Sequence, residues 1–563
     1  MRDFMYKFTK ELNKREIEVI KITDVKTNKT VSLNSEIAPL KEIERFCQKI
    51  NNNMFYFIIG SGNGRILEYL LDQKFKSKFF ILEIFDEIEY TDEYKEVLKE
   101  FNIVLSHNSK INYLEISGAI RNSMGMECEV LIHPNYDRVN SELLSPILKK
   151  IKMGLVTATI NKNTENYFKF EWITEPILNL SITKNARSLL EIKDKFIDKD
   201  VILVSSGPSM SDHIDFIKKN SPSAYIIASG SAVNGLINNG IMPDFVTIMD
   251  GSSINYTAHF EKTQYTGPII ITGTTNHSIL KNHKGEIFVT NFAQDTITAV
   301  ERKDLLNVPN VPSVALYSLL LTHYLGAKNV YMVGQDLALA NGQYYAKGVS
   351  EHANMKNLGQ TIEVESNNGE MTHTTFGLAS TLESFNNIVS IINQTNSNIR
   401  IYNLAKDGAK IKGVPYINSK EIKFDAKVEK YWINRSLNKV DLNYNYSAEM
   451  LRKIEACKIE VDYAVRKINQ MNLSAISLKD LKKVLLLLKS LRENEILEIH
   501  ILNMLYSTTK SINNMFEFGF EDNFETNQER VDMINKFKIF IEYIQKYLVG
   551  LLESPGLVQL NKE

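Results

Sequence analysis

Short apolar runs separated by helical patterns constrain the fold of this chain more than any other feature. They dominate residues 200–420, where each run is three to five residues long. Buried parallel strands have this apolar character, and crossover helices join them. The runs are Val201–Val204, Tyr225–Ala228, Phe245–Met249, Ile269–Thr272, Ile287–Val289, Val330–Val333 and Ile399–Tyr402. We therefore predict a doubly wound, largely parallel α/β sheet in a central domain over residues 199–424.

The same alternation of apolar runs and helical patterns occurs, less clearly, in the first part of the chain. Apolar runs alternate there with helical patterns, which predicts a Rossmann-like N-terminal α/β domain over residues 1–160. The runs are Met54–Ile59, Phe79–Ile84 and Val130–His133. A connecting helical segment is expected over residues 161–198, with one helix near Ile177–Lys195.

Strand patterns end near residue 425, and helical signals replace them. Ser477 with Asp480, and Thr526 with Glu529, have the spacing of capping boxes that open helices. Apolar residues of the last predicted helix fall on one face, as in a packed helix. They are Val531, Ile534, Phe537, Ile541, Ile544 and Leu548. We predict an all-helical C-terminal domain over residues 425–563.

Composition excludes several classes of protein. A chain of 563 residues is too long for one hydrophobic core. The net charge of -1 argues against a bulk electrostatic nucleic-acid binder. Cys47, Cys128 and Cys457 are far apart and lack companion histidines, which argues against a disulfide framework or structural zinc. Because the N-terminus lacks a signal-peptide core and no apolar run could span a bilayer, we predict a cytoplasmic protein.

A glycine-rich loop follows the first strong strand pattern. Met54–Ile59 runs into Gly60–Gly64, a helix follows, and Glu83 comes about 20 residues later. This arrangement is typical of an adenosylmethionine or dinucleotide site, and it leaves a methyltransferase open as one alternative. A tight strand-to-helix turn explains the same glycines, and we favour that structural interpretation.

The strongest chemical pattern begins at the first strand of the central domain. That strand ends in the loop Ser205–Ser209. Gly207 permits close approach of a ligand, Pro208 stiffens the loop, and Ser209 is expected to cap the following helix. Free N–H groups at a helix start suit a phosphate. We therefore predict an anion-binding loop here.

Small or polar residues also end the neighbouring strand patterns. They are Ser229-Gly230-Ser231, Asp250-Gly251 and Gln335-Asp336. Open α/β sheets bind ligands at the carboxyl ends of their strands, so these positions are candidate ligand contacts. Gln335 and Asp336 are equally suited to satisfy the backbone of a turn. Ser313 is expected to cap a helix, a geometry that also binds carboxylates.

A long polar insertion covers residues 340–372. Within it, two strand-like stretches flank Asn367–Gly369, which predicts a β-hairpin with an Asn-Gly turn. Loops of this length inside a domain are functional lids or disordered segments.

Four of these segments occur together in a fixed order. They are SGPSM from Ser206, GIMPDFVTIMDG from Gly240, VPSVALYSLLLTHYLGAKNVYMVGQDLA from Val311 and NLAKDGAKIKGV from Asn403. This ordered set resembles the motility accessory factor (Maf) family of flagellin glycosyltransferases. The central domain is similar to bacterial sialyltransferases and to 6-hydroxymethylpterin pyrophosphokinase-like proteins. The resemblance covers residues 200–415.

The resemblance implies a fold, a donor and an acceptor. The central domain would be a sialyltransferase-like variant of the GT-A-like type. The donor would be CMP-pseudaminic or CMP-legionaminic acid, and the acceptor a serine or threonine of flagellin. Gly207, Pro208 and Ser209 match the loop that holds the nucleotide, and Ser313 matches a serine that holds the sugar carboxylate. The loop lacks the asparagine that sialyltransferases have between glycines, and VPSV replaces a glycine-rich segment around Ser313.

Transfer of such a sugar requires departure of the CMP phosphate and removal of a proton from the acceptor hydroxyl. His352 and His373, in or beside the insertion, and Asp336 are the candidate bases. Tyr344 or Tyr345 would assist the phosphate. Since Asp250 is a single acidic position, we expect a metal-independent enzyme that needs no cofactor. The predicted donor-binding residues are Ser206, Gly207, Pro208, Ser209, Ser229, Gly230, Asp250, Gly251, Ser313, Gln335 and Tyr345.

Two further alternatives stay open from the sequence. A pterin pyrophosphokinase-like enzyme would use ATP and magnesium on the same central fold. A flagellin-binding chaperone would use the C-terminal helices and have no catalytic role. The added domains and the long insertion favour an enzyme with a macromolecular acceptor.

Overall fold

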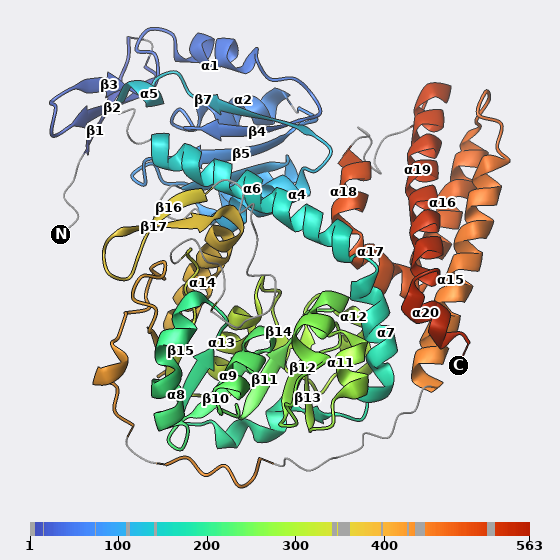
Figure 1. Ribbon diagram of the computed structural model, residues 1–563. Helices are drawn as coiled ribbons and strands as arrows, with labels where there is room; N and C mark the ends of the chain where they lie inside the picture. Colours follow the sequence, from blue (N-terminus) through green and yellow to red (C-terminus); the bar gives the residue numbers. More distant parts are fainter. Residues whose placement is uncertain are drawn as a thin grey trace. The chain divides into compact units, whose positions relative to one another are not determined.

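The protein has an α/β fold with two parallel sheets, as the alternating apolar runs predict (Figure 1). A computed structural model gives its architecture. The described residues are 6–14, 16–73, 75–107, 113–139, 144–339, 346, 361–395, 398–424, 427–433, 445–514 and 524–562.

The chain divides into two compact units. Unit 1 contains residues 1–163, 467–486 and 505–542. Unit 2 contains residues 164–466, 487–504 and 543–563. The helices after residue 445 are therefore shared between the two units. The four domain boundaries expected from the sequence stay predictions.

Unit 1 is built on a four-stranded parallel sheet in the order β6-β5-β4-β7. Its strands contain the three apolar runs of the N-terminal region. They are β4 (Met54–Ile59), β5 (Lys78–Glu83), β6 (Ile103–His107) and β7 (Glu127–Ile132). The helices that connect them are α2 (Arg65–Gln73), α3 (Asp92–Glu100) and α4 (Tyr113–Asn122), and α1 (Pro39–Cys47) precedes β4. A separate antiparallel sheet comprises β1 (Tyr6–Leu12), β2 (Glu18–Asp24) and β3 (Thr30–Ser32).

Unit 2 contains a larger parallel sheet in the order β14-β13-β12-β11-β10-β9-β15-β18, with β8 beside β13. All seven apolar runs predicted for this region are strands. The strands are β8 (Arg187–Ser188), β9 (Asp200–Val204), β10 (Tyr225–Ser229), β11 (Phe245–Ile248), β12 (Ile269–Thr272), β13 (Ile287–Phe292), β14 (Asn307–Val308), β15 (Asn329–Val333) and β18 (Arg400–Asn403). Strands β10 to β14 extend the sheet on one side of β9, and β15 and β18 extend it on the other. The direction of winding therefore changes between β9 and β15.

Apolar side chains cover both faces of this sheet, because alternate residues of a strand point to opposite faces. Val201 and Leu203 belong to the cluster that contains α13 and α14, whereas Ile202 and Val204 belong to a second cluster with α8, α9 and α11. This two-sided burial explains the continuous apolar runs. The helices are α8 (Ile214–Asn220), α9 (Val233–Asn238), α11 (His277–Asn282), α12 (Thr296–Glu301), α13 (Val314–Tyr324) and α14 (Phe376–Gln394).

The helix expected near Ile177–Lys195 is wrong in its bounds. Helix α6 (Leu144–Phe168) is followed by α7 (Glu171–Thr183), which starts earlier and ends earlier than expected. The Arg302 guanidinium donates to the carbonyls of Thr183 and Ala186 and so satisfies the end of α7. The chain then pairs with β13 through β8 and continues as a 3-10 helix, η2 (Leu189–Lys195).

Beyond residue 445 the described residues form helices. Both capping boxes are confirmed: the Asp480 N–H donates to the Ser477 hydroxyl, and the Glu529 N–H to the Thr526 hydroxyl, each at 3.2 Å. The helices are α15 (Asn445–Asn469), α16 (Leu478–Arg492), α17 (Leu502–Met504), α18 (Tyr506–Asn514), α19 (Asn527–Leu552) and α20 (Pro555–Leu560). In α19 the predicted apolar stripe is largely buried. Among the described helices, none combines the length and apolarity that crossing a membrane requires.

Candidate functional site

The change of winding direction in unit 2 brings together two polar loops that follow neighbouring strands. Ser205–Ser209 follows β9, and Gly334–Asp336 follows β15, the strand beside it. The Gly207 N–H donates to the Gly334 carbonyl at 3.0 Å, and the Ser205 hydroxyl donates to Gln335 Oε1 at 3.0 Å. A point where the winding reverses is the usual ligand crevice of an open α/β sheet. We call this set of residues the switch-point site.

Asp336 organises the switch-point site. Its carboxylate is only 5% exposed and accepts hydrogen bonds from the Ser209 hydroxyl at 2.9 Å and the Ser209 N–H at 3.2 Å. Burial raises the pKa of Asp336 to about 6, against the opposing effect of the two Ser209 bonds. The carboxylate therefore changes charge in a pH range suited to acid–base chemistry.

The expectation that Ser209 caps a helix is wrong. The loop leads into a 3-10 helix, η3 (Pro208–His213), and Gly207 occupies the cap position without a side-chain bond. Ser209 is the second residue of η3, and Asp336 accepts its N–H. The physical reason is that a carboxylate from the neighbouring strand reaches the amide that a cap or a phosphate would otherwise take.

Two glycines make this close junction possible. A Cβ atom on Gly207 would collide with the Asp336 carboxylate and the Gly334 carbonyl. Gly334 has φ +69°, and its Cβ atom would collide with the Ser205 carbonyl. Leu337, the residue after Asp336, has φ +51°, an unfavourable conformation for a side chain of its size. The backbone is therefore strained next to the buried carboxylate.

Three serines extend the site toward β10. The Ser231 hydroxyl donates to Ser206 Oγ at 2.8 Å and lies 3.2 Å from Ser229 Oγ, and Gly230 packs against Phe260. A narrow crevice with no space for a water molecule lies between the ends of β9, β10 and β15 and the first turns of α13. Ligand entry at this point requires the loops to separate.

Three predicted contacts lie at other strand ends or helix starts. Asp250, after β11, is exposed and accepts the Ser252 N–H at 2.8 Å. Gly251 is buried, with no room for a Cβ atom beside the Thr274 carbonyl. Ser313 caps α13 by accepting the Leu316 N–H at 3.2 Å, so its capping role is confirmed. Its role toward a carboxylate stays a prediction.

The predicted hairpin is confirmed, and it adjoins the switch-point site. Strands β16 (Thr361–Glu365) and β17 (Met371–Thr375) pair antiparallel, and Gly369 in the turn has φ +88°. The Leu339 N–H donates to the His373 carbonyl at 2.8 Å, and Thr374 Oγ1 donates to the Leu337 carbonyl at 2.8 Å. The exposed His373 side chain thus belongs to a strand tied to the Asp336 segment. His352, Tyr344 and Tyr345 lie outside the described residues.

Two features of the site were not singled out from the sequence. Asn403 is fully buried in β18, and its Nδ2 donates to the Gln335 carbonyl at 3.1 Å. This bond holds the backbone of the turn that carries Asp336. At the ends of β11 and β12, His277 Nδ1 lies 3.0 Å from Glu175 Oε2, and burial raises the pKa of this carboxyl group. Asn403 opens the NLAKDG segment, where its amide gives no local signal of its partner, and Glu175 and His277 are too far apart in sequence to reveal their pairing.

The glycine loop of unit 1 has an internal explanation. Glu83 is fully buried and accepts hydrogen bonds from Ser61 and, at 2.8 Å, from the Tyr136 hydroxyl. The Tyr136 ring occupies the space where a Cβ atom on Gly60 would lie. The carboxylate that would meet a ribose is therefore already engaged, which supports the structural interpretation of these glycines.

Comparison with known proteins agrees with this architecture. A family model described as 6-hydroxymethylpterin diphosphokinase MptE-like matches residues 177–342, which include both loops of the switch-point site. A solved structure titled "Structure of MAf glycosyltransferase from Magnetospirillum magneticum AMB-1" aligns with a TM-score of 0.57 and 13% sequence identity, over 97% of this chain and 92% of that chain. The chain has a Maf-like fold. No curated protein matches it in sequence. The resemblance to Maf proteins with an MptE-like central domain, inferred from the ordered segments, is thereby confirmed.

Within the Maf-like fold, the described residues contain no group of three or more histidine, cysteine, aspartate or glutamate side chains placed to hold a metal ion. The three cysteines are free thiols: Cys47 and Cys457 are buried, and Cys128 is exposed. The switch-point site therefore offers hydroxyl groups, backbone N–H groups and one titratable carboxylate.

Proposed function

We propose that this protein is a glycosyltransferase that moves a nonulosonic acid, pseudaminic or legionaminic acid, from its CMP-activated form to serine or threonine residues of flagellin. The Maf-like fold over nearly the whole chain supports the general reaction. The observation that carries the proposal is the junction of Ser205–Ser209 with Gly334–Asp336 at the reversal of the sheet. Ligands of open α/β sheets bind at such a reversal.

In this proposal the nucleotide lies over the Ser205–Ser209 loop, and its phosphate takes the Ser209 N–H that Asp336 accepts in the ligand-free protein. The acceptor hydroxyl attacks the anomeric carbon, the bond from that carbon to the phosphate oxygen breaks, and CMP leaves with the electron pair. The hydroxyl proton passes to a base, for which Asp336, His352 and His373 are the candidates. Ser313 orients the donor carboxylate with the N–H groups that open α13.

Asp336 has a second role that follows from its contacts. Its bonds to Ser209 fix the loop, so departure of the nucleotide phosphate is coupled to the charge of this carboxylate. A phosphate that takes the Ser209 N–H releases Asp336 and leaves it free to accept a proton. The proposed reaction takes place in the cytoplasm and needs neither a cofactor nor a metal ion.

The MptE-like match favours one second candidate, a pyrophosphoryl transferase that uses ATP and magnesium. Nucleotide preference separates the two reactions. We expect CMP to raise the thermal stability of the purified protein, because a ligand at 100 times its Kd stabilises by about 2.7 kcal/mol. Ser209→Trp would abolish this shift by filling the loop. Ser211→Trp, an exposed serine of the same 3-10 helix, is the matched control and would keep it.

A shift with ATP and magnesium alone would refute the transferase in favour of pyrophosphoryl transfer. No shift with CMP, ATP or adenosylmethionine would favour a flagellin-binding chaperone. If CMP raises the thermal stability, the decisive assay is incubation of the protein with a CMP-nonulosonic acid and flagellin. Intact-mass and peptide mass spectrometry then detect the product. Modified serine or threonine peptides are the expected product.

A further inference from the structure

The backbone turn after β15 is held at four successive carbonyl groups. Each carbonyl from Gly334 to Leu337 accepts a hydrogen bond from another part of unit 2. In order along the turn, the donors are the Gly207 N–H at 3.0 Å, Asn403 Nδ2 at 3.1 Å, the Ala409 N–H at 2.7 Å and Thr374 Oγ1 at 2.8 Å. Of the two side-chain donors, Asn403 also accepts the Ala405 N–H at 3.1 Å, so replacement of Thr374 disturbs fewer contacts.

Thr374 holds the residue of this turn with the least favourable backbone. Leu337 has φ +51°, and a left-handed conformation of a large side chain persists only where the surroundings enforce it. Both residues are buried, Leu337 at 6% exposed and Thr374 at 0%. A buried carbonyl that loses its donor loses the compensation for its burial. Removal of the Thr374 hydroxyl should therefore release the turn that carries Asp336.

The Thr374 hydroxyl is itself fixed in place. Within the hairpin, Thr374 pairs with Ile362 of β16. The next residue, Thr375, caps α14 with its side chain. Phe385 of that helix belongs to the same core cluster as Leu337. The hydroxyl is thus a rigid point of the core, against which the turn is held.

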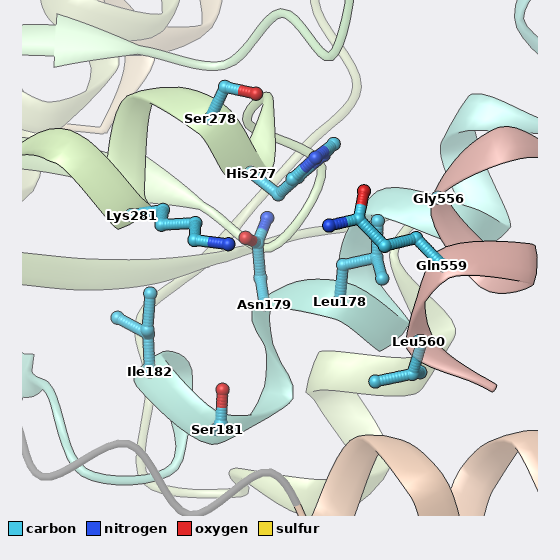
Figure 2. A pocket seen from close by; sticks show the side chains of 10 residues that line it. All are labelled: Leu178, Asn179, Ser181, Ile182, His277, Ser278, Lys281, Gly556, Gln559 and Leu560. Carbon is cyan, nitrogen blue, oxygen red and sulfur yellow. The ribbon is translucent and has the colours of Figure 1, made fainter. Parts of the chain in front are cut away.

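A cavity of about 180 Å³ between α7, α11 and α20 has a different set of contacts (Figure 2). Among the side chains that Figure 2 shows, Asn179 donates to two carbonyls after β12, and His277 Nδ1 is held by Glu175 of α7. These contacts belong to α7, α11 and the end of β12. The Thr374 bond, in contrast, belongs to the turn that carries Asp336.

We propose that Thr374 is a positioning residue for the transfer reaction, whose hydroxyl holds Leu337 and so places the Asp336 carboxylate against Ser209. Asp336 has its part in transfer only under the proposed function, on which this assignment rests. The hairpin at the end of the long insertion thereby contributes a rigid part of the donor site. Thr374 acts on the reaction through Asp336 and not through a contact with substrate.

Three variants separate positioning from a general effect on folding. Thr374→Val keeps the size and shape of the side chain and removes the hydroxyl. Thr374→Ser keeps the hydroxyl and is the conservative variant. Thr372→Val is the matched control, because Thr372 lies on the same face of β17 and its hydroxyl makes no hydrogen bond among the described residues.

Thermal unfolding measures the link to Asp336 without CMP or flagellin. In the wild-type background, Asp336→Asn should gain about 4 °C in Tm between about pH 4.5 and 7.5, because it lacks the buried carboxyl group. In the Thr374→Val background the carboxyl group is released toward water, and this gain should fall below about 2 °C. The Thr374→Ser and Thr372→Val backgrounds should keep the full gain. Asp212 and Asp407 also raise the pKa of Asp336 by charge repulsion, and their effect cancels because every variant retains them.

The transfer assay tests the consequence for the reaction. Thr374→Val should lower kcat by about tenfold or more and shift the kcat–pH profile to lower pH, with KM changed by less than about threefold. Thr374→Ser should restore the wild-type profile.

Two results would overturn the proposal. One is a Thr374→Val variant that lowers Tm equally at every pH and leaves the Asp336→Asn gain unchanged, since the hydroxyl is then only structural. The other is an active Thr374→Val variant with unchanged kcat and pH profile. If the wild-type protein transfers no sugar, the proposed function fails, and the thermal comparison still decides whether Thr374 positions Asp336.

Discussion

Replacement of Asp336 by asparagine gives the sharpest test of the switch-point site, because its effect depends on pH in a predictable direction. The folded protein raises the pKa of this carboxyl group from the ordinary value of 3.8 to about 6 by burying it. Between these two pH values the folded state retains a proton that the unfolded state has lost. The stability of the wild-type protein therefore falls as pH rises through this window.

The size of the effect follows from the same values. Each pH unit between the two pKa values corresponds to 1.36 kcal/mol, so the full difference corresponds to about 3 kcal/mol as an upper limit. Asp336→Asn lacks this penalty and keeps an oxygen that accepts the Ser209 hydroxyl hydrogen bond. The variant should thus gain stability relative to wild type as pH rises from about 4 to 7, and most of the gain should be complete near pH 7.

Thermal unfolding of both proteins between pH 4.5 and 7.5, in one buffer series of constant ionic strength, measures this difference. With an unfolding entropy of about 2.1 cal/mol/K per residue and roughly 340 residues in unit 2, 3 kcal/mol corresponds to about 4 °C in Tm. Asp215→Asn, an exposed aspartate at the start of α8, is the control and should show no such rise. A difference between Asp336→Asn and wild type that stays constant, or that shrinks as pH rises, would refute the argument that burial dominates this carboxylate.

Three substitutions in unit 2 and one metal-removal experiment give further predictions. Gly334→Ala should lower the free energy of unfolding by about 1–3 kcal/mol through overlap with the Ser205 carbonyl, measured by denaturant unfolding, and should abolish CMP binding. Gly369→Ala, also at positive φ but with open space around it, should cost only about 1 kcal/mol. Ser313→Ala should cost about 1 kcal/mol as a lost helix cap and raise the KM for the CMP-sugar; an unchanged KM would leave Ser313 a cap alone. Addition of EDTA should not change the transfer rate, and a loss restored by magnesium would contradict the metal-independent reaction.

Much of the architecture of unit 2 followed from local sequence patterns. Runs such as Val201–Val204 and Val330–Val333 are strands within one residue of their predicted bounds, because a strand buried on both faces needs apolar residues throughout. The Ser477–Asp480 and Thr526–Glu529 boxes and the hairpin turn at Gly369 are equally local. Each depends on groups that are at most a few residues apart.

The sequence alone could not show which polar group satisfies which partner. Ser209 has the composition of a helix cap, yet Asp336, 127 residues later, takes its N–H because β15 lies beside β9. The helix expected to reach Lys195 ends at Thr183, since Arg302 satisfies its last carbonyls. Periodicity reports how a segment is buried, but strand order decides which distant side chain reaches it. Sequence thus determined the elements and their faces, and only the tertiary structure decided the contacts of the switch-point site.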